Sequence, residues 1–133
     1  MMRARWLLAL VAAAAYGCRS AEGPVAGELA VRLATTRSGD RAILLRVVGR
    51  QHGVRAPSAS TYRVVSDTSA AGDTTWIAVI TPQGSALVSG DVARLAVPDT
   101  RRVADYVVSL TDVALYNYLV GDTTGIVLSV VKP

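Results

Sequence analysis

Short apolar segments that alternate with polar positions run through the chain from residue 27 onward. In residues 29–33, Leu29, Val31 and Leu33 share one face of an extended chain, whereas Arg32 lies on the other. Alternation with a period of two is typical of a β-strand that buries one face. This pattern, or a composition rich in β-branched residues, predicts further strands over residues 41–48, 62–66, 74–81, 86–89, 92–97, 103–115 and 126–132. The inward sets predicted for these strands include Ile43, Leu45 and Val47; Leu95 and Val97; Tyr106, Val108 and Leu110; and Ile126, Leu128 and Val130.

The segment over residues 103–115 is the longest, and two interpretations of it stay open. As one strand, it needs a β-bulge near Asp112 to return Val113 and Leu115 to the inner face. Alternatively, a helix begins at Thr111, because later apolar residues follow at helical spacing.

About seven short strands, separated by turns rich in Gly, Pro and Asp, predict an all-β fold. Their spacing favours a two-sheet antiparallel β-sandwich, in which each strand needs one apolar face. The composition, 51% hydrophobic and 18% charged, is that of a globular protein. Residues 50–60, which contain Gly53 and Pro57, are predicted to form an exposed loop.

The first residues have the pattern of a secretory signal peptide. Arg3 and Arg5 precede an uncharged apolar run over residues 6–15. This run is shorter than the roughly 20 apolar residues of a membrane-spanning helix. It suits the apolar region of a signal peptide, which has about 7–15 residues.

Residues 15–18, Ala-Tyr-Gly-Cys, resemble the lipobox of bacterial lipoproteins. The resemblance implies cleavage after Gly17 and a diacylglyceryl group on the sulfur of Cys18, which is the one cysteine of the chain. Two alternatives to lipidation stay open. Cys18 could be an ordinary thiol beyond a conventional cleavage site, or the N-terminal segment could stay uncleaved as a membrane anchor. In enteric-type bacteria, an Asp directly after the lipidated cysteine resembles an inner-membrane retention signal. This chain has Arg19 at that position instead. We therefore expect the bacterial cell envelope, and the outer membrane if the host has two membranes.

This interpretation divides the chain into a signal peptide (residues 1–17), a lipid-anchored tether (18–26) and a β-sandwich domain (27–133). The formal charge of +4 falls to +2 when Arg3 and Arg5 leave with the signal peptide. The remaining arginines are scattered rather than clustered, so no nucleic-acid partner is expected.

In broad outline the domain also resembles cohesin-like or immunoglobulin-like modules of bacterial surface proteins. The resemblance rests on the strand over residues 27–34, the strand end over residues 92–99 and the long last strand pair. Trp76 is present without the two flanking cysteines of immunoglobulin domains. A binding or scaffolding role is what this resemblance implies.

The sequence predicts no catalytic residue, no cofactor and no metal site. His52 is the sole histidine, and it lies in a polar segment where we expect an exposed side chain. A Ser-His-Asp triad would need this histidine to be held by an acid. The tetrapeptide Gly-Asp-Thr-Thr occurs twice, at residues 72–75 and 121–124. It could contribute oxygen ligands to a calcium ion, but turn chemistry explains it with fewer assumptions.

The aromatic residues supply the remaining candidates. We expect Trp76 and Tyr106 in the core, whereas Tyr116 and Tyr118 flank Asn117 near a loop and are candidates for binding a ligand. The sequence therefore predicts a lipid-anchored envelope protein that binds or scaffolds a protein or polysaccharide and is not an enzyme. A carbohydrate-binding module that uses Tyr116 and Tyr118 is one alternative, and a small envelope hydrolase built around His52 is another.

Overall fold

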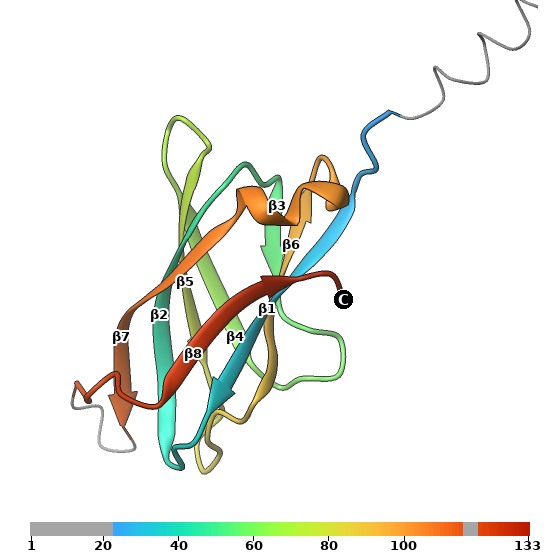
Figure 1. Cartoon of the computed structure of the whole chain (residues 1–133). Coiled ribbons are helices and arrows are strands. Elements are labelled where there is room, and N and C mark those ends of the chain that lie inside the picture. The colour runs from blue at the N-terminus through green and yellow to red at the C-terminus, as the bar shows by residue number, and fades with distance from the viewer. Residues whose placement is uncertain (1–22, 116–119) are drawn as a thin grey trace, which may run out of the picture.

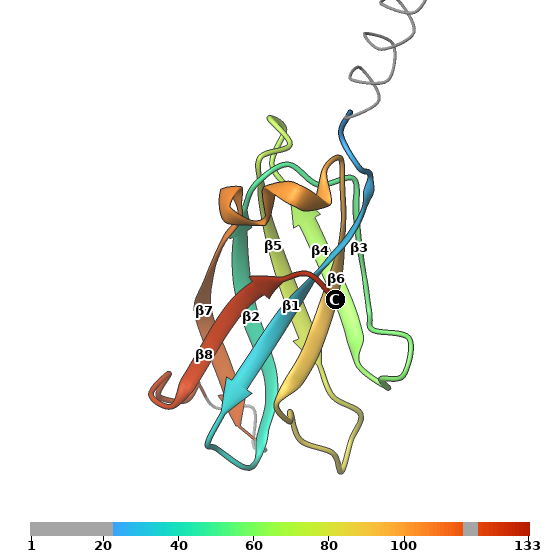
Figure 2. The ribbon, with the colours of Figure 1, turned by 45° about the vertical axis from the view of Figure 1, so that its right-hand side comes forward.

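Two four-stranded antiparallel sheets face each other and form a β-sandwich, as Figures 1 and 2 show. The computed structural model describes residues 23–115 and 120–133. The strand order is β3-β6-β1-β8 in one layer, the β1 sheet, and β4-β5-β2-β7 in the other, the β2 sheet. The strands are β1 (Gly27–Thr35), β2 (Asp40–Val48), β3 (Gly53–Arg55), β4 (Arg63–Thr68), β5 (Thr74–Ile80), β6 (Gly90–Val97), β7 (Val107–Leu115) and β8 (Ile126–Val131). A 3₁₀-helix, η1 (Thr100–Asp105), precedes β7. The predicted all-β sandwich is confirmed.

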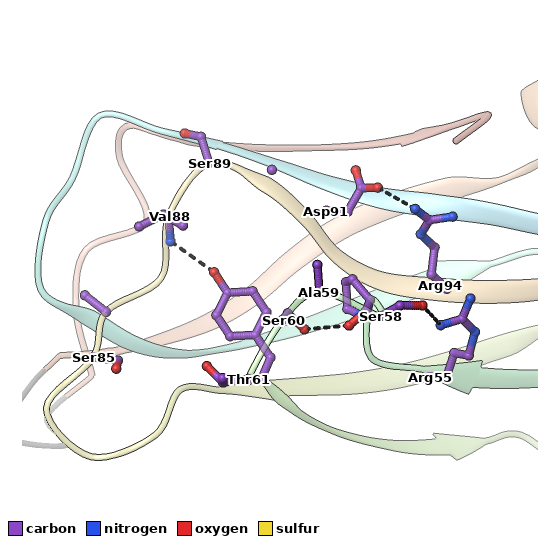
Figure 3. A pocket seen from close by; sticks show the side chains of 14 residues that line it. Arg55, Ser58, Ala59, Ser60, Thr61, Ser85, Val88, Ser89, Asp91 and Arg94 are labelled. Atoms are coloured by element: carbon purple, nitrogen blue, oxygen red, sulfur yellow. Dashed lines mark hydrogen bonds and ion pairs between the residues drawn. The ribbon is translucent and has the colours of Figure 1, made fainter.

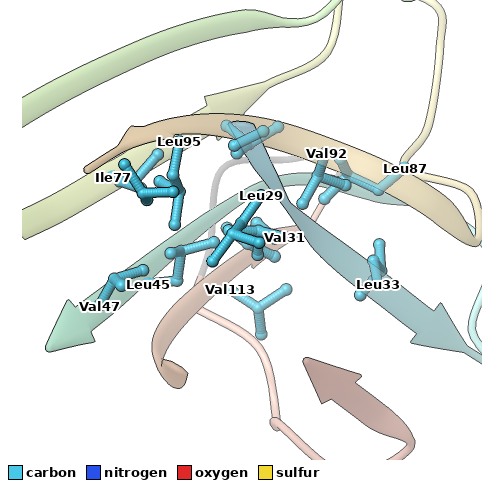
Figure 4. Close-up of a cluster of buried hydrophobic side chains, with 14 residues drawn as sticks. Leu29, Val31, Leu33, Leu45, Val47, Ile77, Leu87, Val92, Leu95 and Val113 are labelled. Atoms are coloured by element: carbon cyan, nitrogen blue, oxygen red, sulfur yellow. The ribbon is translucent and has the colours of Figure 1, made fainter. Parts of the chain in front are cut away.

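The core lies between the two sheets and is made of the inward residues that the alternation predicts (Figure 4). Leu29, Val31 and Leu33 of β1 are buried, and Arg32 between them is exposed. The β2 sheet contributes its own alternating set, and β6 contributes Leu95 and Val97. Fully burying each such side chain contributes roughly 1.5–3 kcal/mol. The fully buried apolar residues of the β2 sheet are Ile43, Leu45, Val47, Ile77, Val79 and Val113.

The predicted bulge in β7 is confirmed. Leu45 pairs with Leu110 and Leu44 pairs with Asp112, so Thr111 has no partner on β2. The extra residue returns Val113 to the inner face, where it is buried. The alternative of a helix from Thr111 is wrong as far as Leu115, because residues 107–115 form a strand.

Three predicted elements need correction. The segment 50–60 is not a simple loop, because β3 within it pairs with β6 and adds an eighth strand. Residues 86–89 form no strand, although Leu87 is buried and belongs to the hydrophobic core. The strand predicted from residue 103 begins at Val107, because η1 occupies the preceding residues.

The chain enters the sandwich beside η1 (Figure 1). The Val25 amide donates to Asp99 Oδ1 at 3.3 Å, and the Thr100 amide donates to the Val25 carbonyl at 2.8 Å. Arg101 Nη2 donates to the Gly23 carbonyl at 2.8 Å. Residues 23–26 are therefore held against the Asp99–Arg101 turn, and we call these contacts the N-terminal clamp.

Acid is expected to open the N-terminal clamp. The side-chain hydrogen bond from Arg101 is the main reason why the pKa of Asp99 falls from its ordinary value of 3.8 to about 2. Because the folded pKa is depressed, the stabilisation is complete above about pH 4 and is lost as the pH falls through 2. We expect hydrogen-exchange protection of the Thr100 amide to fall over this range, and Asp99→Asn to lower it already at neutral pH.

The matched control for this measurement is Asp105→Asn. Asp105 pairs with Arg102 at 2.9 Å and does not contact the clamp. Equal losses of Thr100 protection in both variants would show that the Asp99 carboxylate has no special role.

Candidate binding surfaces

The three residues that the sequence singles out as site residues lie outside the described residues. Cys18, Tyr116 and Tyr118 fall within residues 1–22 and 116–119. Lipidation of Cys18 and ligand binding by the two tyrosines therefore stay predictions.

His52 is exposed just before β3, as predicted. Its backbone amide donates to the Ala96 carbonyl at 2.8 Å and so starts the pairing of β3 with β6. Its imidazole has no hydrogen-bond partner among residues 23–115 and 120–133. Within this part of the chain, nothing holds His52 as the base of a catalytic triad.

The two Gly-Asp-Thr-Thr segments lie at opposite ends of the sandwich. The first leads into β5 at the end of the sandwich that carries η1, and the second precedes β8 at the other end (Figure 1). Asp122 accepts hydrogen bonds from the Thr124 amide at 3.0 Å and from its hydroxyl at 2.9 Å, which is an Asx-turn. These bonds also lower the pKa of Asp122, the backbone bond from Thr124 contributing most. Among the described residues, no group of three or more His, Cys, Asp or Glu could hold a metal ion.

The two aromatic residues expected in the core differ in outcome. Tyr106 packs against the core, and its hydroxyl donates to the Arg50 carbonyl. Burial is the main cause of the raised pKa of Tyr106. The prediction for Trp76 is wrong: this side chain is 38% exposed, because it projects from the outer face of β5. Its neighbours Thr75 and Ile77 point inward instead and are buried.

A groove of about 650 Å³ lies between residues 57–62 and 85–91 (Figure 3). Arg55 and Arg94 lie at one end of it, and Val88 lies towards the other. Tyr62 joins its two walls, since its hydroxyl accepts a hydrogen bond from the Val88 amide at 3.3 Å.

Most polar groups of this groove already have partners within the protein. Arg55 donates to both carboxylate oxygens of Glu28, at 2.7 and 2.6 Å, and to Ser58 Oγ at 3.1 Å. Ser60 Oγ donates to the Pro57 carbonyl at 2.9 Å. Arg94 Nε is buried without a hydrogen-bond partner in the described chain. These bonds brace the groove walls, and a single unpaired nitrogen does not define a ligand.

The outer face of the β2 sheet carries exposed apolar side chains on all four strands, among polar and charged ones, and we call it the outer β2 face. Its exposed large side chains come from every strand, and small side chains lie between them. The small residues Ala42, Ala78 and Ala114 help to form a shallow hollow of about 340 Å³, bordered by Ile80 and Val120. The remaining apolar members of the face are Leu44, Val48, Val65, Trp76 and Val107.

The outer face of the β1 sheet has the opposite character. Arg55 pairs with Glu28, while Arg32 and Arg94 pair with Asp91 at 3.0 and 3.1 Å. The two-pronged hydrogen bond from Arg55 is the main cause of the lowered pKa of Glu28. The outer face of the β1 sheet thus carries three ion pairs, whereas the outer β2 face carries most of the large exposed apolar side chains of the two sheets.

Comparison of the chain with family models, with curated proteins and with solved structures found no match. The resemblances to lipoproteins and to cohesin-like or immunoglobulin-like modules therefore stay predictions. In the part of the chain that the structure describes, no helix is long and apolar enough to cross a membrane.

Sequence reasoning missed the outer β2 face. The apolar residues at its positions, such as Leu44 and Ile80, are visible in the sequence as members of continuous apolar runs over residues 42–45 and 77–80. In a two-sheet sandwich only one face of each strand packs on the core, so a strand that is apolar on both faces leaves one apolar set outside. That signal could have identified the surface before the structure.

Proposed function

We propose that this protein is a lipid-anchored envelope protein that binds a protein partner through the outer β2 face. It carries lipid on Cys18 and acts as a binding or scaffolding domain, not as an enzyme. The observation that carries the proposal is the set of exposed apolar side chains on all four strands of the β2 sheet, together with the hollow beside Ile80. Large exposed apolar patches on soluble domains mark sites of interaction.

The charges around this face favour a protein over a lipid surface. Arg46 and Arg63 lie on it together with Asp67 and Asp112, and all four are exposed. An anionic bilayer attracts cations and repels the two carboxylates. Protein interfaces combine apolar side chains with charged residues, and here charges of both signs lie among the apolar side chains of the face.

The hollow beside Ile80 suits an apolar side chain from the partner. Its lining is aliphatic apart from Asp112, so a Leu, Ile or Phe side chain of the partner would bury apolar surface there. Such buried anchors carry most of the energy of protein interfaces.

Ile80→Lys is expected to abolish partner binding in the full-length protein in its own envelope. A photo-reactive amino acid at Val48, on the rim of the face, should yield an adduct of defined mass. A charge placed in a binding hot spot weakens affinity on the order of thirtyfold or more, so Ile80→Lys should remove the adduct. Mass spectrometry of the adduct identifies the partner.

The matched controls lie on the opposite side of the sandwich. Val127 projects from the outer face of β8, so Val127→Lys should leave the adduct unchanged, and a photo-reactive residue at this position should give none. The proposal is wrong if Val127 captures the same partner, or if the Val48 adduct contains only a second copy of this chain.

A further inference from the structure

Within the described chain no strand pairs with the free side of the edge strand β4, although β3 of the other sheet lies near it. The backbone of β4 pairs with β5 alone, the Thr68 hydroxyl accepts a hydrogen bond from Gln51 Nε2 at 2.9 Å, and five of the six residues of β4 are exposed. Its register with β5 is continuous from Arg63–Ile80 to Thr68–Thr75, with no bulge. It also contains no Gly and no Pro. Bulges, prolines and very short length are devices that keep edge strands from pairing, and β4 has none of them.

The backbone groups that face away from the sheet can be assigned. The Ser69 amide donates to the Thr74 carbonyl at 2.8 Å, just beyond the end of β4. Hydrogen bonding in an antiparallel pair alternates along the strand, so Arg63, Val65 and Asp67 direct their backbone groups towards β5. Val64 and Ser66 therefore direct their N–H and C=O groups outward, where another strand could bind.

The side chains of β4 are complementary to their own antiparallel copy. Arg63, Val65 and Asp67 project from the outer β2 face and are exposed, and neither charged residue forms an ion pair within the described chain. A second copy with Val65 on the two-fold axis places Arg63 opposite Asp67 of the partner subunit. The same register lets Val64 and Ser66 exchange backbone hydrogen bonds with the partner subunit's Ser66 and Val64.

We propose that two copies of this protein pair through β4, antiparallel and centred on Val65. The two β2 sheets then form one continuous eight-stranded sheet. Arg63 and Asp67 lie at positions without mutual backbone bonds, where opposed side chains are closest and opposite charges stabilise the pair. This inference goes beyond the proposed function, since it does not depend on what the outer β2 face binds.

The other sheet edges are poorer candidates. β3 has three residues, and β7 is interrupted by its bulge at Thr111. β8 carries no charged residue between Ile126 and Val131, so nothing would select one register over another. The charge pattern Arg-x-x-x-Asp, symmetric about a central valine, occurs on β4.

Cysteine cross-linking in the full-length protein tests this geometry. Two facing residues without mutual backbone bonds have Cα atoms about 4.5 Å apart, within the range that a disulfide spans. We expect Val65→Cys to give a covalent dimer under mild oxidation, seen on a non-reducing gel. Val107→Cys is the control, because Val107 is more exposed (62% against 48%) but lies on the far strand β7. The unsubstituted protein, which keeps Cys18, gives the background.

Charge reversal in the Val65→Cys background tests the register. Arg63→Asp or Asp67→Arg alone places like charges opposite each other twice, and the cross-linked fraction should fall about tenfold. The double reversal restores both pairs and should restore the dimer. Arg50→Asp, in the exposed loop before β3, makes the same change of charge away from β4 and should have no effect.

A variant without added charge completes the test. Ser66→Pro removes an outward-facing amide and leaves the bonds to β5 in place, so it should keep the melting temperature and lose the dimer. Cross-linking of Val65→Cys no greater than that of Val107→Cys would overturn the proposal. The proposal would also be overturned if the double-reversal variant had the melting temperature of the wild type but cross-linked no better than either single charge reversal.

Discussion

Val31→Asp is expected to leave the protein unfolded. Val31 has no exposed surface and lies in the middle of β1, paired with Ala93 on one side and Val130 on the other. A carboxylate there has no hydrogen-bond partner and no route to water, so it either stays charged in an apolar medium or binds a proton at a cost. The loss should exceed about 5 kcal/mol, comparable with the whole free energy of unfolding of a small domain.

Far-ultraviolet circular dichroism and thermal melting of the purified full-length protein measure this effect. Val127→Asp makes the identical change on β8, where the side chain is 64% exposed, and should melt close to the wild type. Leu128→Asp, half-buried on the edge strand β8, should lie between the two. A cooperative wild-type transition for Val31→Asp would mean that the assignment of the inner face of β1 is wrong.

Cys18→Ala is expected to release the protein from the membrane. Each buried methylene of a lipid chain contributes about 0.8 kcal/mol, and stable anchoring needs two chains or a second signal. A diacylglyceryl group supplies two. The described chain offers no other anchor of this strength, because its apolar outer β2 face also carries the carboxylates of Asp67 and Asp112. Nearly all of the variant should therefore appear in the soluble fraction.

Fractionation of cells and mass measurement of the mature N-terminus check this result. The wild-type protein should begin at Cys18 and carry the mass of the lipid. Ser20→Ala is a suitable control, since it changes a residue two positions after the cysteine without removing the thiol. The lipoprotein interpretation does not survive if Cys18→Ala stays on the membrane in the same proportion, or if the wild-type N-terminus is unmodified.

The strands that bury one face could be predicted because period-two alternation is a direct consequence of the pleat. β1, β2 and β7 illustrate this, and even the bulge at Thr111 follows from the change of phase in residues 107–115. β3 could not be predicted, because three residues are too few to show an alternation of apolar and polar positions. Its residues Gly53 and Arg55 are also typical of a loop. Its pairing with β6 comes from tertiary contact rather than from local preference.

Trp76 shows a different limit. β5 is apolar on both faces, so alternation gives two sets of residues but does not say which set is inside. The large apolar side chain of Trp76 is the reason to expect it in the core. In the structure Ile77 and Val79 are buried instead, and Trp76 lies on the outer β2 face. The sequence of β5 alone does not tell which of its faces is buried. The pairing register of β5 with β2 and β4 decides this.

The position of β1 determines when the fold can be completed. β1 lies between β6 and β8, and its partner residues on β8 reach from Ile126 to Val131. A chain that emerges from the ribosome or from a membrane pore N-terminus first leaves one side of β1 unpaired until residue 131 is free. Contacts of such long sequence separation make folding slow, on the scale of milliseconds to seconds for sandwiches. The nascent chain must therefore keep the apolar residues of β1 soluble through nearly all of its synthesis.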